Sequence, residues 1–217
     1  MAVALFVLSG LALGAAVQPL VFDLKAAPGE TIPFSVAVTA QDVQEIIDVS
    51  LHGVLQGVDG NLQYSQDFPN PALNWVQLDS NRIVIPPNEE RQITGVVRVP
   101  LNAEGTHVVI LMVEPDAGIT SGQVTFRFRY AVRLVINVER AGLRPDVVLE
   151  SVGLQGDAEG NPIIRAIIHN KSSLLFPVSA EVTIRDENRA LVERIQLRPT
   201  GQLDPSQPPS INIYPGA

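Results

Sequence analysis

The chain has 217 residues, 46% of them hydrophobic, and a formal net charge of −8. This length fits one large domain or two of ordinary sandwich size, and the apolar content is ample for packed cores. The negative charge argues against a general nucleic-acid-binding protein, which needs a broad basic surface, and the absence of cysteine excludes disulfides and thiol nucleophiles.

The N-terminal stretch is apolar from Ala2 to Ala16 and is followed by Pro19. It resembles a secretory signal peptide cleaved after Ala16, because Gly14 and Ala16 place small side chains at the cleavage positions. It is short for a membrane span. No Lys or Arg precedes the apolar run, so a buried first strand or helix is the alternative. A signal peptide at residues 1–16 predicts a protein outside the cytoplasm.

Strand-like segments then recur at close spacing, separated by turns that draw on 17 prolines and 16 glycines. This rhythm is typical of antiparallel sandwiches. The segments expected in the first half are Val21–Leu24, Thr31–Thr39, Ile46–Leu55, Leu62–Ser65, Trp75–Leu78, Arg82–Ile85, Gln92–Val99, Thr106–Val113 and Val124–Glu139. Gln41–Ile47 is the one place where a helix is an alternative.

The segment Val124–Glu139 alternates over about twice the length of an ordinary strand. Apolar side chains fall on one face, and Arg127, Arg129 and Arg133 fall on the other. In one interpretation these arginines form a solvated strand face paired with acidic neighbours. In the other they face a cleft between two domains and hold a peptide C-terminus or an anionic wall polymer, since guanidinium groups suit carboxylates and phosphates.

After the linker Arg140–Pro145, further strands are expected at Asp146–Leu154, Ile163–His169, Val178–Arg185 and Ala190–Leu197. The late Pro215–Gly216 turn should lead into another strand, which does not follow in the sequence. We therefore expect an all-β protein with two immunoglobulin-like β-sandwich domains in tandem. The first spans residues 17–141. The second, residues 142–217, is expected to be C-terminally truncated or completed by a partner's strand.

Residue patterns of catalysis and metal binding are missing from the sequence. His52, His107 and His169 are isolated from one another, so each is expected to be structural. No serine lies in a Gly-x-Ser-x-Gly elbow. The best calcium candidate, Asp157–Asn161, reads equally well as a turn. We expect a non-enzymatic protein with no catalytic residues, no metal site and no cofactor.

Two other residues have alternative interpretations. Trp75, the only tryptophan, is expected to anchor the core, with a surface platform for sugar or peptide as the alternative. Asn170 begins the triplet Asn-Lys-Ser, which matches a glycosylation sequon, but such triplets are frequent by chance.

Six motifs occur in order: LVFDLKAAPGETIPFSVAV, GVDGNLQYS, IVIPPNEERQITGVVRVPLNAEGTHVVILMV, FRYAVRLVINV, RPDVVLESVGL and IIRAIIHNKSSLLFPVSAEVTIRD. Together they resemble the WxL-interacting proteins of bacterial cell surfaces. The resemblance implies a peptidoglycan-binding-type domain followed by part of a host-binding-type domain, both immunoglobulin-like and outside the cell. Members usually continue into a membrane helix and a basic tail, which this sequence does not reach, so membrane anchoring is undecided.

A more distant resemblance is to the periplasmic chaperones of pilus assembly, which are also two sandwich domains joined at an angle. Their long last strand of the first domain corresponds to Val124–Glu139. In that family an Arg on the first strand and a Lys on this last strand bind a subunit's terminal carboxylate. Here the corresponding strands carry Lys25 and Arg133, with the two residue types exchanged, which alters the geometry but keeps the charge.

These observations predict an extracytoplasmic binding or scaffold protein, at the cell surface, in the wall or in the periplasm. It is expected to bind another cell-envelope protein or filament subunit, or peptidoglycan or another anionic wall polymer, by strand addition at a sheet edge. The expected partner-binding residues are Arg127, Arg129, Arg133 and Lys25. The alternative function is a periplasmic chaperone for pilus or other surface-filament subunits.

Overall fold

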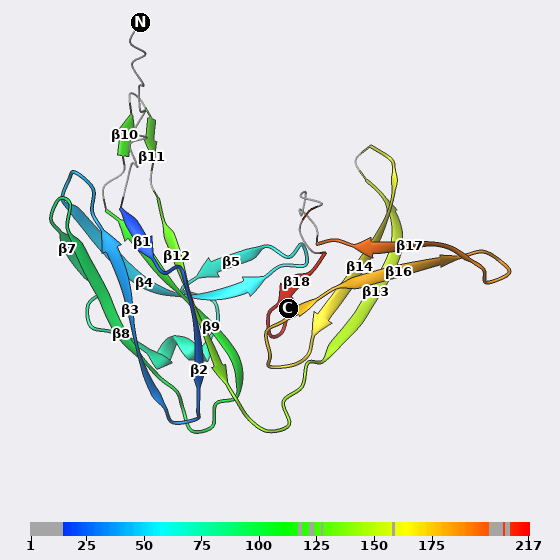
Figure 1. Ribbon diagram of the computed structural model, residues 1–217, viewed down its shortest axis with the longest axis horizontal. Helices are drawn as coiled ribbons and strands as arrows, with labels where there is room; N and C mark the ends of the chain where they lie inside the picture. Colours follow the sequence, from blue (N-terminus) through cyan, green and yellow to red (C-terminus); the bar gives the residue numbers. More distant parts are fainter. Residues whose placement is uncertain are drawn as a thin grey trace, which may run out of the picture.

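The computed structural model describes residues 15–116, 119–121, 124–126, 128–157, 159–199, 206 and 209–217, with the backbone alone at 119–126. The expected fold class is confirmed: the chain is all-β and forms two immunoglobulin-like domains, seen on the left and right of Figure 1. The one helical element in the described ranges is the 3-10 helix η1 (Pro71–Trp75). No described helix combines the length and apolar character that a membrane crossing requires.

Two sheets pack face to face in the first domain (Figure 1). One has the order β1-β3-β8-β6, formed by β1 (Ala16–Gln18), β3 (Thr31–Thr39), β8 (Glu90–Arg98) and β6 (Val76–Leu78). The other has the order β2-β12-β9-β4-β5, formed by β2 (Val21–Ala26), β12 (Tyr130–Val138), β9 (Gly105–Pro115), β4 (Glu45–Gln56) and β5 (Leu62–Ser65), with β7 (Arg82–Ile85) paired to β4.

Alternating sequences make the facing sides of these sheets apolar. In β3 Phe34, Val36 and Val38 are buried between the sheets, and Val132 and Leu134 of β12 join the same core. Such alternation is the period-2 pattern of a half-buried strand. The register that buries this face is therefore strongly specified.

Strand β9 is apolar on both faces, as its near-continuous hydrophobic run predicts. Val109 and Leu111 pack into the sandwich core. Val108, Ile110 and Met112 point the other way and form a second apolar cluster. The sheet that contains β9 therefore has a second buried face, which lies against the second domain.

The first strand segment changes sheets at Pro19. β1 pairs antiparallel with β3, and β2 then pairs parallel with β12, with Val21 opposite Arg133. The Gln18–Pro19 peptide between them is cis. Because β2 begins only at Val21, it covers the edge of β12 from Arg133 to Val138 and no further.

The expectation of one long strand at Val124–Glu139 is wrong. Val124–Phe126 (β11) instead pairs with Ile119–Ser121 (β10), and β12 begins at Tyr130. The reason lies in β9: Tyr130 is the first residue of β12 with a partner there, and beyond it β9 pairs with β4 alone. An alternating sequence does not indicate where the neighbouring strand stops pairing with it.

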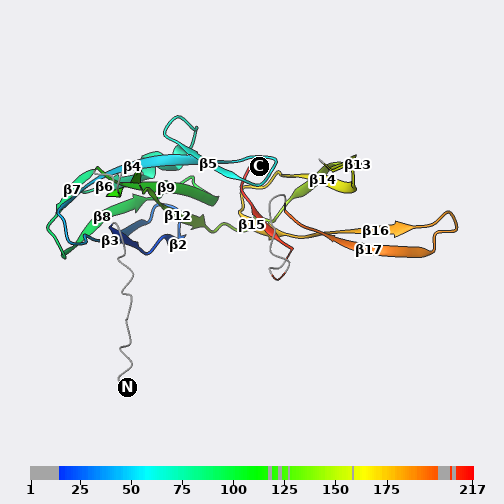
Figure 2. The ribbon, with the colours of Figure 1, turned by 90° about the horizontal axis from the view of Figure 1, so that it is seen from above.

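The second domain is built from antiparallel pairs. They are β13 (Val147–Gly156) with β14 (Pro162–Asn170), β15 (Phe176–Val178) with β18 (Ile211–Ile213), and β16 (Ala180–Arg185) with β17 (Leu191–Leu197). The β13–β14 and β16–β17 hairpins project away from the first domain, whereas β18 lies on the side toward it (Figures 1 and 2). The strand expected at Val178–Arg185 is thus divided between β15 and β16, and β18 was not anticipated. The residue limits of the two domains and of the signal peptide stay predictions.

Asn170, at the end of β14, holds the last residues of the chain in place. It is completely buried, and its Nδ2 donates to the carbonyl oxygens of Leu174 (2.7 Å), Ile213 (3.2 Å) and Tyr214 (3.1 Å). Its Oδ1 accepts from the backbone N–H and the hydroxyl of Ser172. The nitrogen of the sequon is therefore occupied in the folded protein, and Asn170 has a structural role.

Candidate functional site

The two domains meet at an apolar cluster centred on Tyr214. This side chain is only 6% exposed and packs with Val108, Ile110, Met112 and Val135 of β9 and β12. The second domain therefore packs against the outward face of β9 and β12. Burial of an aromatic side chain in such a cluster favours a fixed relation between the domains.

Gln56 bridges the same contact between the two domains, which we call the domain seam, with its side-chain amide. Its Nε2 donates to the carbonyl of Asn212 (3.0 Å), and its Oε1 accepts from the backbone N–H of Tyr214 (3.0 Å). The amide thus satisfies backbone groups of Asn212, within β18, and of Tyr214, which follows it, much as a neighbouring strand would. A third bond joins the domains where Thr106 N–H donates to Ser173 O (2.7 Å).

Arg133 lies on β12 at this seam. Its Nη1 donates to the hydroxyl of Tyr214 at 3.2 Å, and its Nε is buried without a hydrogen-bond partner. No carboxylate of the described residues lies within 4.0 Å of its guanidinium. Burial and the neighbouring Tyr214 raise the pKa of Tyr64, and the charge of Arg133 partly opposes this. Arg133 is thus a cation bonded to Tyr214, with its Nε donor unused.

The edge of β12 is open just before Arg133. The N–H of Arg133 donates to Leu20 O (2.9 Å), so its backbone faces the side that β2 occupies. Because backbone groups alternate along a strand, the N–H and C=O of Ala131 face the same side. β2 does not reach Ala131, and no other strand in the described part of the chain pairs with that side of it.

Three large, exposed apolar residues lie next to this open edge along the chain. Leu20 and Val21, where β2 begins, are 47% and 48% exposed, and Phe128, just before β12, is 46% exposed. Apolar side chains beside an unpaired strand edge are features that soluble proteins usually avoid unless a partner covers them. We call Ala131, Leu20, Val21 and Phe128 the β12 edge site.

The four predicted site residues are not brought together. Arg129 is largely exposed and forms an ion pair with Glu114 (3.2 Å), as expected for a solvated strand face. Lys25 is exposed beside Asn137, four residues along β12 from Arg133, which corresponds to about 13 Å in a strand. Arg127 lies outside the described residues. Arg133 alone reaches the seam, because Ala131 and Val135 share its face and the second domain covers that face.

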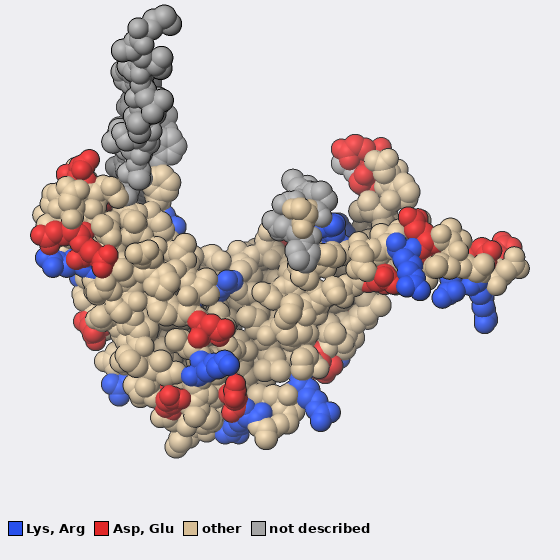
Figure 3. Space-filling view, viewed as in Figure 1, with Lys and Arg blue, Asp and Glu red and all other residues tan. Residues whose placement is uncertain are grey.

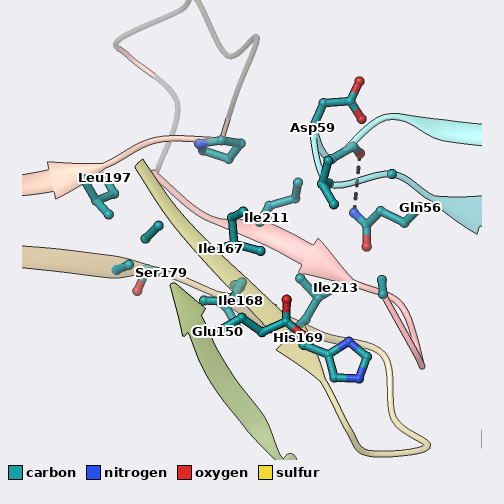
Figure 4. Close-up of a pocket in the computed structure, with 18 of the residues that line it drawn as sticks. Gln56, Asp59, Glu150, Ile167, Ile168, His169, Ser179, Leu197, Ile211 and Ile213 are labelled. Carbon is teal, nitrogen blue, oxygen red and sulfur yellow. Dashed lines mark hydrogen bonds between the residues drawn. The ribbon is translucent and has the colours of Figure 1, made fainter. Parts of the chain in front are cut away.

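A cavity of about 360 Å³ lies on the other side of the seam (Figure 4). Gln56 ends β4 and Asp59 lies in the turn that follows, while Ile167 and Ile211 approach each other from β14 and β18. Most of the remaining lining is apolar and comes from the second domain. The cavity thus lies between strands of the second domain and the turn that joins β4 and β5 of the first.

Charged side chains are sparse on the upper surface between the domains, whereas the projecting β16–β17 hairpin carries both signs (Figure 3). A surface of this kind suits an apolar or mixed partner better than a polyanion. This view does not show a broad basic groove that could bind an anionic polymer.

Trp75, His107 and Asp157 have surroundings that fit a role in the fold. The ring of Trp75 is buried and lies 4.3 Å from that of His107. Oxygens of Asp157 accept hydrogen bonds from Glu159 and Asn161, which is the geometry of a turn. No group of three or more metal-ligating side chains is found among the described residues.

Sequence reasoning missed Tyr214, Gln56 and Ala131. Tyr214 is an aromatic residue beside the Pro215–Gly216 turn, but the sequence does not indicate what its ring packs against. Gln56 gave no signal, because a glutamine at a strand end is ordinary. Ala131 is recognisable only once the extent of β2 is known.

No protein-family model matches the chain, and no curated protein matches it. Among solved structures, the chain is similar to a chaperone–tip adhesin complex of CFA/I fimbriae biogenesis, with 13% identity and a TM-score of 0.53 over 94% of this chain and 83% of that chain. It is also similar to the class 5 fimbriae chaperone CfaA, with 13% identity and a TM-score of 0.52 over the same shares of the two chains.

A third similar structure is the CsuC–CsuE chaperone–tip adhesion subunit pre-assembly complex from the archaic chaperone-usher Csu pili of Acinetobacter baumannii. Identity is 12% and the TM-score 0.51, over 94% of this chain and 88% of that chain. At these identities the similarity shows the fold, which is that of the two-domain pilus chaperones. The resemblance to WxL-interacting proteins, with its implied peptidoglycan binding, gains no support from the comparisons.

Proposed function

We propose that this protein is an extracytoplasmic chaperone-like protein that holds an extended strand of a surface-filament subunit or related envelope protein at the β12 edge site. The observation that carries the proposal is the open backbone of Ala131, beyond the end of β2 and beside exposed apolar side chains. The similarity to fimbrial chaperones supports it at the level of the fold.

Backbone pairing supplies the general affinity. A partner strand in line with β2 finds the N–H and C=O of Ala131 unpaired and extends the sheet by one more strand, as in other cases of strand addition. Each new backbone bond contributes about 1 kcal/mol net. Leu20, Val21 and Phe128 then select partners with apolar side chains at matching positions.

Arg133 supplies the charge recognition. Its Nε is buried without a partner, and no carboxylate in the described ranges lies within 4.0 Å of its guanidinium. A carboxylate from the partner, such as its C-terminus, would therefore complete its hydrogen bonds. Hydrogen bonds to charged groups contribute about 1.5–3 kcal/mol. Of the predicted arginines, this role is assigned to Arg133 and not to Arg129.

The test compares Ala131→Pro with Ala131→Ser, each produced as a tagged protein in its native host, where co-purified envelope proteins are identified by mass spectrometry. Proline removes the open N–H while the bonds of Tyr130 and Val132 to β9 remain, and serine keeps the N–H. We expect a complex with the wild type and the serine variant and none with the proline variant, all three having comparable melting temperatures. A stable complex with a folded proline variant would contradict the proposal.

A surface scaffold that binds the cell wall would behave differently. Purified peptidoglycan sacculi, incubated with the same three proteins, should not sediment them. Sedimentation with all three variants alike would favour wall binding through another surface.

A further inference from the structure

Glu45 is a carboxylate buried without a partner. It is the first residue of β4, only 5% exposed, and its side chain lies on the same strand face as the core residues Ile47 and Val49. Its Oε2 has no hydrogen-bond partner, and no Lys, Arg or His nitrogen of the described residues lies within 4.0 Å of it. Burial raises its pKa. A buried charge of this kind is costly unless a cation accompanies it.

Tyr130 connects Glu45 with the start of the described chain. Its hydroxyl donates to the carbonyl oxygen of Ala15, and the pKa of that hydroxyl is raised by burial and by the charge of Glu45. Ala15 itself is buried in the first-domain core. Ala15 precedes the Ala16–Thr39 pair, and Glu45 begins the strand that follows β3, so both lie at the end of the sandwich where β3 leads into β4. The nitrogen of Ala15 is two bonds removed from the carbonyl carbon whose oxygen accepts the bond from Tyr130.

Ala15 and Ala16 are integral to the sandwich. Ala16 pairs with Thr39 of β3, and Ala15 accepts the bond from Tyr130. Processing after Ala16, the site expected from the signal-peptide pattern, would remove both contacts. Ala12 and Gly14 also place small side chains two residues apart, which equally suits processing between Gly14 and Ala15.

We propose that the chain is cleaved between Gly14 and Ala15, and that the new α-ammonium group of Ala15 is the missing partner of the Glu45 carboxylate. Cleavage creates one positive charge at the end of the sandwich where the Glu45 carboxylate is buried. The end of the first-domain sandwich is then closed by an ion pair that only the processed chain can form. This inference is independent of the β12 edge site.

The first experiment identifies the mature N-terminus. The full chain is expressed with export in a bacterial host, and the exported protein is examined by intact mass and N-terminal sequencing. The expected species is 15–217. A mature chain that begins at Val17, or an exported chain that is not cleaved, would overturn the cleavage part of the proposal.

The second experiment tests the ion pair in a double-mutant cycle. Residues 15–217, which contain every described element, are prepared with a free or an acetylated N-terminus, each with Glu45 or with Glu45→Gln. With the free amine, Glu45→Gln should lower the melting temperature by about 5 °C or more, because it leaves the ammonium buried alone. With the acetylated terminus it should leave the melting temperature unchanged or raise it, because it removes an unpaired buried charge.

Acetylation of the wild type provides a measurement that does not alter the core. It should lower the melting temperature by a similar amount to Glu45→Gln in the free-amine protein. An equal effect of Glu45→Gln in both backgrounds, or no effect of acetylation, would show that the Ala15 ammonium is not the partner of Glu45.

Discussion

The guanidinium of Arg133 donates to the hydroxyl of Tyr214 at 3.2 Å, across the boundary between the two domains. Arg133 is on the strand that carries the open edge, and Tyr214 follows the strand that docks the second domain. One hydrogen bond therefore links the position of the second domain with the cation beside the β12 edge site.

Replacing Arg133 by Ala should weaken binding of the co-purified partner by about tenfold or more, because a hydrogen-bonded charge is lost. The matched control is Arg129→Ala, which should change the affinity by less than about threefold, since an exposed ion pair such as that with Glu114 contributes little. Isothermal titration calorimetry with both variants measures this. Equal losses would mean that Arg133 has no special role.

Replacing Asn170 by Ala should reduce the free energy of unfolding by about 3 kcal/mol, because it removes the side-chain donor that the carbonyl groups of Leu174, Ile213 and Tyr214 share. Of these, the Tyr214 carbonyl keeps the N–H of Ala217. Urea denaturation gives the value. Ser172→Ala removes one hydroxyl bond to the same side chain and the bond that the hydroxyl accepts from the Leu174 N–H; it is the control and should cost about 1–2 kcal/mol. A loss below that of the control would contradict the role assigned to Asn170.

Much of the first domain could be predicted from sequence. The limits of Thr31–Thr39, Leu62–Ser65 and Arg82–Ile85 agree with β3, β5 and β7, because alternation sets the strand faces and nearby turns set the ends. Strand β18 could not be anticipated, since it has three residues and depends on β15 for its pairing. Short strands are specified by contacts distant in sequence.

The functional site was harder to predict for the same reason. The alternation of arginines correctly indicated that Arg133 leaves the sandwich core, but it could not distinguish it from Arg129. The distinction arises from Tyr214, 81 residues further along the chain. The open edge depends on where β2 changes sheets, and this is a tertiary feature without a local pattern.

Stability should fall on mild acidification because of His107. Burial against Trp75 lowers its pKa below the ordinary value of 6.5, and its bond to the Glu104 carbonyl only partly opposes this. The unfolded chain therefore binds the proton more readily than the folded chain. The contribution of neutral His107 to the free energy of unfolding is fully present above pH 6.5 and is lost as the pH falls through the folded-state pKa. Melting temperatures from about pH 7.5 to 5.5 should decrease more for the wild type than for His107→Phe. Parallel curves would exclude His107 as the source.

Gly105 and Gly142 form a matched pair for testing the domain seam. Both have positive φ, +84° and +93°, so alanine strains the backbone at either position. At Gly105 the new Cβ would also lie 2.3 Å from Ser173 O, whereas at Gly142 no atom is within 4 Å.

Gly105→Ala should therefore reduce the free energy of unfolding by about 2 kcal/mol more than Gly142→Ala, since it displaces the partner of the Thr106 N–H. It should also speed proteolysis of the linker between the domains. Urea denaturation and limited proteolysis give the two readouts. Similar values for both variants would mean that the seam contributes little to stability.

The short reach of β2 has a consequence for the lifetime of a complex. Within β12 only Ala131 offers both backbone groups on the open side, so an added strand gains few main-chain bonds before it meets β2. Dissociation rates, more than association rates, distinguish related complexes, and so few bonds give a brief residence time unless side chains prolong it. A partner held in this way can be passed on to a surface that offers a longer strand edge.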